Sequence, residues 1–180
     1  VHRLVSYMPA EVRLFPNMNG RDVLRFFSDM HPLGDFRRSI DLARRLELDL
    51  SRKVAYCSTG MKQKIALVST LAPRTPLVIL DEPTSALDPT VRREVLMLLS
   101  EAQQEGQTVL LSSHVLSEVE ASCDRVCILR KGKIAFLDAL ANIQREHRIH
   151  AVMTGSLPAL PTHLKEHARI LQLSEREVQI

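Results

Sequence analysis

Hydrophobic and polar residues follow two periods along the chain, and each period predicts one type of element. Apolar residues at helical spacing predict helices over residues 21–30, 36–48, 61–71, 91–104 and 115–122. Short apolar runs bounded by proline or polar residues predict strands over residues 4–8, 77–80, 108–112, 125–130 and 134–136. The runs at 77–80 and 108–112 are typical of strands buried within a sheet.

From residue 77 onward the elements alternate as strand, helix, strand, helix, strand. That order is typical of a parallel sheet covered by helices, so we expect residues 77–136 to form the sheet. The earlier part of the chain is expected to be an all-helical insert. Further on, the pattern predicts the start of a small accessory α+β unit, with strands at 149–153, 170–173 and 177–180 and a helix at 161–169.

The composition fits one soluble globular domain, since 45% of the 180 residues are hydrophobic and 25% are charged. The 24 Lys and Arg side chains nearly balance the 21 Asp and Glu, and the net charge of +3 gives little support to a nucleic-acid partner. The apolar runs are too short to span a bilayer. The three cysteines form no C-x-x-C pair, which favours a cytoplasmic location.

Candidate chemistry begins at the end of the apolar run 77–80, where Asp81 and Glu82 follow directly. The carboxyl ends of parallel strands form the edge at which open α/β sheets bind ligands. Adjacent residues of an extended strand point to opposite sides, so one carboxylate can hold Mg2+ while the other faces an attacking water. For a bare Asp-Glu pair, an acidic helix cap or a solvated strand end is favoured by roughly three to one.

Three further features favour a functional role of Asp81 and Glu82 over a structural one. A tight acidic loop, residues 85–88, follows the pair, and His114 follows the next predicted strand, so it emerges at the same edge as Glu82. Upstream, Ser-Thr-Gly at residues 58–60 precedes the predicted helix 61–71, and free amide groups at a helix N-terminus can bind an anion. Each feature alone has an ordinary explanation as a turn, a loop histidine or a helix cap. Together and in this order they favour phosphate chemistry.

In this order the motifs resemble the ATP-binding domain of ABC transporters, over residues 1 to 140. The strand that ends in Asp81-Glu82-Pro83-Thr84 resembles the Walker B motif, and residues 85–88 resemble the D-loop. His114 resembles the switch histidine, and residues 57–61 occupy the position of the signature.

The resemblance implies an α/β fold: a partial, P-loop NTPase-like parallel sheet with an all-helical ABC signature subdomain and a small C-terminal α+β extension. Residues 1–76 would hold the Q-loop, the helical subdomain and the signature. Residues 77–140 would hold Walker B, the D-loop and the H-loop within the RecA-like core. Residues 141–180 would begin a C-terminal accessory domain.

The resemblance also implies a role for each candidate residue, with ATP and Mg2+ as cofactors. Asp81 would help to hold Mg2+, Glu82 would polarise the attacking water, and His114 would contact the γ-phosphate. Ser58 and Gly60 would bind the γ-phosphate of an ATP held by the opposite subunit. The residues expected at this shared nucleotide or at the dimer interface are Ser58, Gly60, Met61 and Asp88.

Two motifs depart from the family pattern. The signature usually reads Leu-Ser-Gly-Gly-Gln, whereas Cys57, Thr59 and Met61 replace its Leu, its first Gly and its Gln here. Ala10 stands where the Q-loop glutamine is usual, and our hypothesis is that Glu11 beside it substitutes. Both variants resemble the branch whose ATPases pair with separate ABC-2-type export permeases.

A phosphate-binding P-loop requires the pattern G-x-x-x-x-G-K-[ST], and no two of the six glycines stand five apart. The first residues, from Val1, resemble the interior of a strand. We therefore expect this chain to be an N-terminally truncated fragment of a longer ATPase, with the P-loop encoded upstream.

These observations predict the ATPase subunit of an ABC transporter at the cytoplasmic face of the membrane. Its expected partners are a second ATP-binding subunit and a transmembrane permease, which would dock near residues 13–15 and the helix at 21–30. Two alternatives stay open: a soluble ABC protein of translation or DNA maintenance, and a degenerate regulatory module that does not hydrolyse ATP. An in-frame P-loop upstream of Val1 would favour hydrolysis over the degenerate module.

We expect residues 1–180 alone to release phosphate from ATP no faster than background, because they contain neither the P-loop lysine nor its glycine-rich cradle. A phosphate-release assay on the purified chain measures this directly. Robust turnover would contradict the truncation hypothesis.

Overall fold

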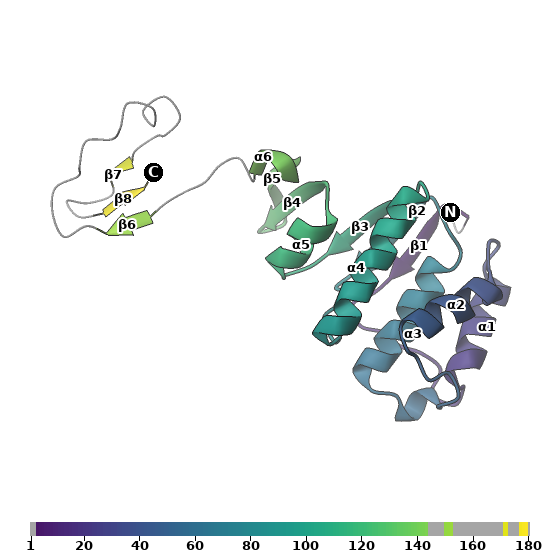
Figure 1. The fold of residues 1–180 in the computed structure, drawn as a ribbon. Helices are drawn as coiled ribbons and strands as arrows, with labels where there is room; N and C mark the ends of the chain where they lie inside the picture. The colour runs from purple at the N-terminus through teal and green to yellow at the C-terminus, as the bar shows by residue number, and fades with distance from the viewer. Residues whose placement is uncertain (1–2, 144–149, 153–170, 173–176, 180) are drawn as a thin grey trace. The chain divides into compact units, whose positions relative to one another are not determined.

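Figure 1 shows the computed structural model of the chain, which describes residues 3–143, 150–152, 171–172 and 177–179. The chain divides into two compact units, one up to residue 122 and one from residue 123. The candidate residues 11, 58–61, 81–88 and 114 all belong to the first unit.

The first unit contains a three-stranded parallel sheet in the order β1 (Val5–Met8), β2 (Leu77–Asp81) and β3 (Thr108–Ser112). Met8 lies opposite Leu80, and Asp81 lies opposite Ser112. Because all three strands run in the same direction, the residues that follow each of them emerge at the same edge of the sheet.

Five α-helices and one short 3-10 helix complete this unit (Figure 1). They are α1 (Gly20–Met30), α2 (Phe36–Arg45), η1 (Val54–Tyr56), α3 (Thr59–Leu71), α4 (Pro89–Gln104) and α5 (Leu116–Ser122). Each of the helices α1, α2, α3 and α4 follows a polar residue whose side chain accepts a backbone N–H group of the first turn. These capping residues are Asn19, Asp35, Ser58 and Asp88. The predicted helices are therefore confirmed in type, with α2 ending three residues earlier than expected.

One core joins the sheet to these helices. Its fully buried members on the sheet are Met8, Val78 and Leu80, and α3 contributes Ile65, Leu67 and Val68. Helices α1 and α4 add Val23, Leu24, Val95 and Leu99. Every helix that contributes to this core packs through its apolar stripe, as the helical spacing in the sequence indicates.

Two expectations about the sheet were wrong. The strand predicted at 125–130 does form, as β4 (Arg125–Arg130), but it pairs antiparallel with β5 (Lys133–Ala139), and β1 supplies the third strand of the parallel sheet. The reason lies in the link between β4 and β5, where Lys131 and Gly132 have φ angles of 50° and 72°. Two positive φ angles in a two-residue connection favour a tight hairpin.

The second error concerns burial. β3 was expected to be buried in the sheet, yet Leu110 is 58% exposed and only Val109 and Leu111 pack against the core. In β2, Val78 and Leu80 are buried while Leu77 and Ile79 are half-buried. Residues therefore alternate between buried and half-buried in β2, and between half-buried and exposed in β3, because Val78 and Leu80 belong to the core while Val109 and Leu111 only pack against it.

The described residues of the second unit also include α6 (Leu140–Ile143) and a small antiparallel sheet in the order β6 (His150–Val152), β8 (Glu177–Gln179), β7 (Leu171–Gln172). These strands confirm the type of element predicted at 149–153, 170–173 and 177–180. The helix predicted at 161–169 lies outside the described residues. Within the described ranges, no helix is both long enough and apolar enough to cross a bilayer.

Candidate functional site

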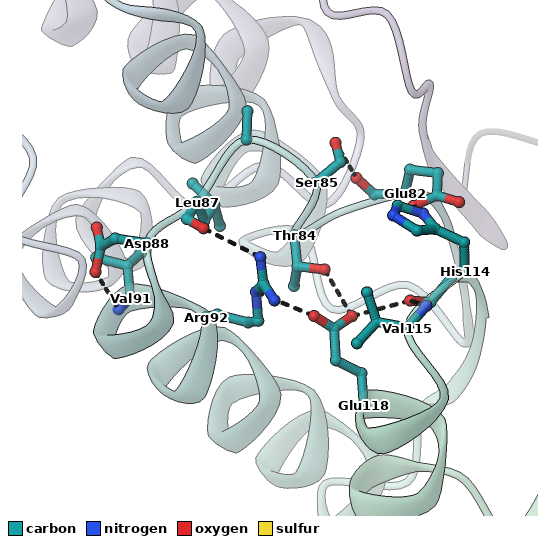
Figure 2. A network of polar contacts seen from close by, with 12 residues as sticks. Glu82, Thr84, Ser85, Leu87, Asp88, Val91, Arg92, His114, Val115 and Glu118 are labelled. Carbon is teal, nitrogen blue, oxygen red and sulfur yellow. Dashed lines mark hydrogen bonds and ion pairs between the residues drawn. The ribbon is translucent and has the colours of Figure 1, made fainter.

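The carboxyl edge of the parallel sheet brings Glu82 and His114 into direct contact. Oε2 of Glu82 lies 2.8 Å from Nδ1 of His114, although the two residues are 32 positions apart in the sequence (Figure 2). The side chain of Glu82 is 28% exposed and that of His114 is 71% exposed. The pair therefore stands at the surface, where a ligand can reach the imidazole ring.

Glu82 has an unusual backbone conformation, with a φ angle of 49° in the left-handed region. For a residue with a Cβ this conformation costs on the order of 1 kcal/mol. Hydrogen bonds on both sides of the residue hold it there. Its N–H donates to Oγ of Ser112 at 2.9 Å, and its carbonyl accepts from Nε2 of Gln63 at 2.7 Å. Backbone strain of this kind is often found at functional sites.

Asp81 lies beside this pair and is suited to a different task. Its Oδ1 accepts the hydroxyl of Ser112 at 2.6 Å, so Ser112 both donates to Asp81 and accepts from the Glu82 amide. Across the described residues, no three His, Cys, Asp or Glu side chains gather into a metal-binding group. Mg2+ is commonly held by one or two carboxylates together with substrate phosphates and water. A single half-buried carboxylate at the ligand edge fits that mode of binding.

Gln63 was missed by the sequence analysis, and it ties α3 to the loop after β2. Gln63 is only 2% exposed. Nε2 donates to the Glu82 carbonyl and to Oγ of Ser85 at 3.2 Å, and Oε1 accepts the amide of Ala86 at 2.9 Å. One buried amide thus satisfies polar groups at both ends of residues 82–86. A glutamine among the buried positions of a helix was the available signal, because buried polar groups need partners.

The start of α3 lies against the same loop. A Cβ added to Gly60 would stand 2.7 Å from the carbonyl oxygen of Ala86, so this close approach requires glycine. Oγ of Ser58 caps the helix by accepting the amide of Met61 at 3.2 Å. Ser58 is exposed, and its hydroxyl can still donate its proton to an anion. Met61 is half-buried in the first turn, with its sulfur 3.9 Å from Nη1 of Arg52.

Asp88 ends the loop and caps α4. Its Oδ1 accepts the amides of Thr90 and Val91, both at 3.1 Å. The pKa of Asp88 lies below its usual value, chiefly because the Val91 amide donates to the carboxylate. Asp88 therefore stays ionised at neutral pH while remaining exposed at the surface.

Glu11 lies in the loop that follows β1, and this loop begins at the same edge of the sheet. Its carboxylate pairs with Nη2 of Arg13 at 2.8 Å, and both side chains are more than 80% exposed. An exposed pair of this kind contributes little stability and leaves both side chains free to move. The structure thus brings together Asp81, Glu82 and His114, places residues 58–61 against the loop that leads to Asp88, and leaves Glu11 apart with Arg13.

The chain was compared with known families and proteins. A family model described as "AAA domain, putative AbiEii toxin, Type IV TA system" matches residues 15–120. MJ1023 of Methanocaldococcus jannaschii, an uncharacterized ABC transporter ATP-binding protein, is 32% identical over 151 residues, which make up 81% of this chain and 58% of that protein.

Solved structures resemble the fold as well. The ATP-binding subunit of an ABC transporter matches with a TM-score of 0.73 and 32% identity, over 79% of this chain and 62% of that chain. The ATP-binding cassette MJ0796, solved as a dimer bound to ADP and Pi, matches in fold with a TM-score of 0.69 and 19% identity, over 77% of this chain and 64% of that chain. The chain spans about three fifths of the length of these relatives.

Replacing Gln63 tests whether it holds the loop. Gln63→Leu keeps the side chain's bulk but leaves the Ala86 amide without its partner and removes one of the donors to the Glu82 carbonyl. We therefore expect the free energy of unfolding to fall by about 1–3 kcal/mol. Urea denaturation of the full chain measures this. Gln104→Leu, at an exposed position of α4, is the control and should change it by less than about 0.5 kcal/mol. Equal effects of the two substitutions would contradict the assigned role.

Proposed function

The chain, which carries an AAA-domain match over residues 15–120, belongs to the ATP-binding domains of ABC transporters, and we propose that its sheet edge cleaves the γ-phosphate of ATP. The observation that carries this proposal is the 2.8 Å contact between Glu82 and His114 at the carboxyl edge of the sheet.

Glu82 has the position of a residue that orients water. One of its carboxylate oxygens faces His114, and the other has no hydrogen-bond partner among the described residues, so it can accept from a water molecule. A carboxylate that aligns the attacking water and accepts its proton is the contribution that phosphoryl transfer requires from a side chain.

His114 complements it from the segment that follows β3. Nδ1 faces Glu82, so Nε2 is the ring nitrogen available to a phosphate oxygen. A protonated ring donates from both nitrogens and can therefore bridge Glu82 and the γ-phosphate. Such a contact stabilises the charge that builds up on the transferred group.

Asp81 is the residue that would hold Mg2+, which supplies positive charge against the phosphates when it is bound. Ser112 fixes the orientation of the Asp81 carboxylate by donating to Oδ1. The same hydroxyl holds the Glu82 amide, so the residue that holds the metal and the residue that orients water share one support.

The nucleotide would lie between two copies of the domain. Ser58 and Asp88 are exposed, and the first turn of α3 presents free amide groups and the positive end of its dipole. With Gly60 and Met61, these residues form the surface that would face the ATP or the loop of the second copy. The MJ0796 cassette, which shares the fold, is a dimer bound to ADP and Pi, and this supports a paired arrangement here.

A transmembrane permease would be the second partner, and it would keep the protein at the cytoplasmic face of the membrane. The rings of Phe15, Phe26 and Phe27 pack against one another with centroids 5.1 to 6.4 Å apart, yet Phe15 and Phe26 remain 44% and 36% exposed. A cluster of partly exposed aromatic rings is typical of a protein interface. Export as the direction of transport rests on the resemblance of the signature and Q-loop variants to ATPases of ABC-2-type exporters.

Glu82→Gln tests the assigned hydrolysis. It retains the shape of the side chain but removes the proton acceptor, so we expect kcat of the complete gene product to fall about 100-fold or more with little change in ATP binding. Steady-state phosphate release and nucleotide titration measure the two quantities. Glu47→Gln, at an exposed glutamate after α2, should leave both unchanged. A Glu82→Gln protein with unaltered kcat would overturn the proposal.

Glu11→Ala tests the substitution of the Q-loop glutamine. If Glu11 turns toward the edge when nucleotide is bound, ATPase activity of the complete gene product should fall by about tenfold, the lower range for loss of one positioning contact. The exposed Glu47→Ala serves as the control. Unchanged activity in Glu11→Ala would reject this role and leave the Glu82 proposal untouched.

A further inference from the structure

Glu118 on α5 is a buried carboxylate for which the proposed reaction has no direct use. It is 4% exposed, and burying a carboxylate is costly unless charged or polar partners surround it. Its partners are Thr84, Ser113 and Arg92, which come from three different segments of the chain (Figure 2). The positions of these three partners indicate the role of Glu118.

One oxygen of Glu118 joins the two segments that carry the hydrolytic pair. Oε2 accepts the hydroxyl of Thr84 at 2.7 Å and the hydroxyl of Ser113 at 3.0 Å. Thr84 stands two residues after Glu82, and Ser113 stands immediately before His114. A single acceptor thus fixes the chain just beyond Glu82 to the chain just before His114.

The other oxygen leads to the loop that ends in Asp88. Oε1 lies 3.1 Å from Nε of Arg92 on α4, whose side chain is 31% exposed. Nη2 of the same guanidinium donates to the carbonyl of Leu87 at 3.3 Å. The contacts therefore run from Leu87, next to Asp88, through Arg92 to Glu118 and on to both segments of the hydrolytic pair.

We propose that Glu118 is a positioning residue for ATP hydrolysis: it sets the placement of Glu82 against His114 and couples it, through Arg92, to the loop at Asp88. This inference rests on the proposed function of the sheet edge. A buried ion pair is weak evidence for stability, since apolar residues of similar size often stabilise a core as well or better. What the carboxylate supplies and an apolar side chain cannot is an acceptor that fixes the direction of two hydroxyl groups and a negative charge that holds one guanidinium close.

Glu118→Gln removes this arrangement with the least change of shape. A glutamine oxygen can accept from Thr84 and Ser113, but its NH2 group then faces the N–H of Arg92, so the two sides cannot both be satisfied. We expect kcat of the complete gene product to fall about tenfold while KM for MgATP changes by less than about twofold, because a misplaced catalytic group affects the chemical step rather than binding. The control is Glu120→Gln, an exposed glutamate on the same helix, which should leave both constants unchanged.

Thr84→Val is the second variant, for the case in which Glu118→Gln does not fold. It removes one hydroxyl from the network and leaves the pair between Glu118 and Arg92 intact, and it should lower kcat in the same way by about threefold. Normal kcat in Thr84→Val together with normal kcat or no folding in Glu118→Gln would overturn the proposal. An increase in KM alone would overturn it as well.

A readout without turnover separates this inference from the function on which it rests. The ring resonances of His114, assigned by their loss in His114→Gln, should shift in the NMR spectrum of Glu118→Gln and stay in place in Glu120→Gln. If the complete wild-type gene product hydrolyses no ATP, the proposed function fails, and this shift still decides whether Glu118 positions His114. Identical His114 resonances in wild type and Glu118→Gln would show that it does not.

Discussion

The parallel pairing of β2 with β3, with Asp81 opposite Ser112, is the constraint on which the candidate site depends. Parallel strands in this register end at the same level, so the segments that follow them, which carry Glu82 and His114, emerge at the same edge. Glu82 and His114 can then touch, and Ser112 can reach both Asp81 and the Glu82 amide. A shift of one residue would turn these side chains to the opposite face of the sheet and separate them.

The loop from Glu82 to Asp88 is attached at three places, each on a different helix. Gln63 and Gly60 hold it against α3, Asp88 forms the cap of α4, and Glu118 binds Thr84 from α5. A movement of the start of α3 must therefore displace this loop or break buried hydrogen bonds, which are costly to leave unmade. In the proposed dimer, this would connect the surface that meets the second copy's nucleotide with the residues that cleave the first.

Local patterns in the sequence predicted what local physics determines. Apolar residues at helical spacing located the helices, and the carboxylates after residues 77–80 marked the ligand edge. The pairing of β1 with β2 was missed because their residues lie about seventy positions apart, and no local pattern records such a partner. The hairpin of β4 and β5 could have been predicted, since Lys131-Gly132 is a two-residue turn. Gln63 and Glu118 were missed because their partners are also distant in the sequence, 19 and 34 residues away.

The central proposal is that ATP is cleaved at the edge where Glu82 meets His114. A crystal structure of the complete gene product with Mg2+ and a non-hydrolysable ATP analogue tests this most directly. We expect the terminal phosphate to lie against His114 and Glu82 of one copy, Mg2+ to lie near Asp81, and the Ser58 and Gly60 turn of a second copy to close over the nucleotide. An analogue bound away from the carboxyl ends of β2 and β3 would contradict it.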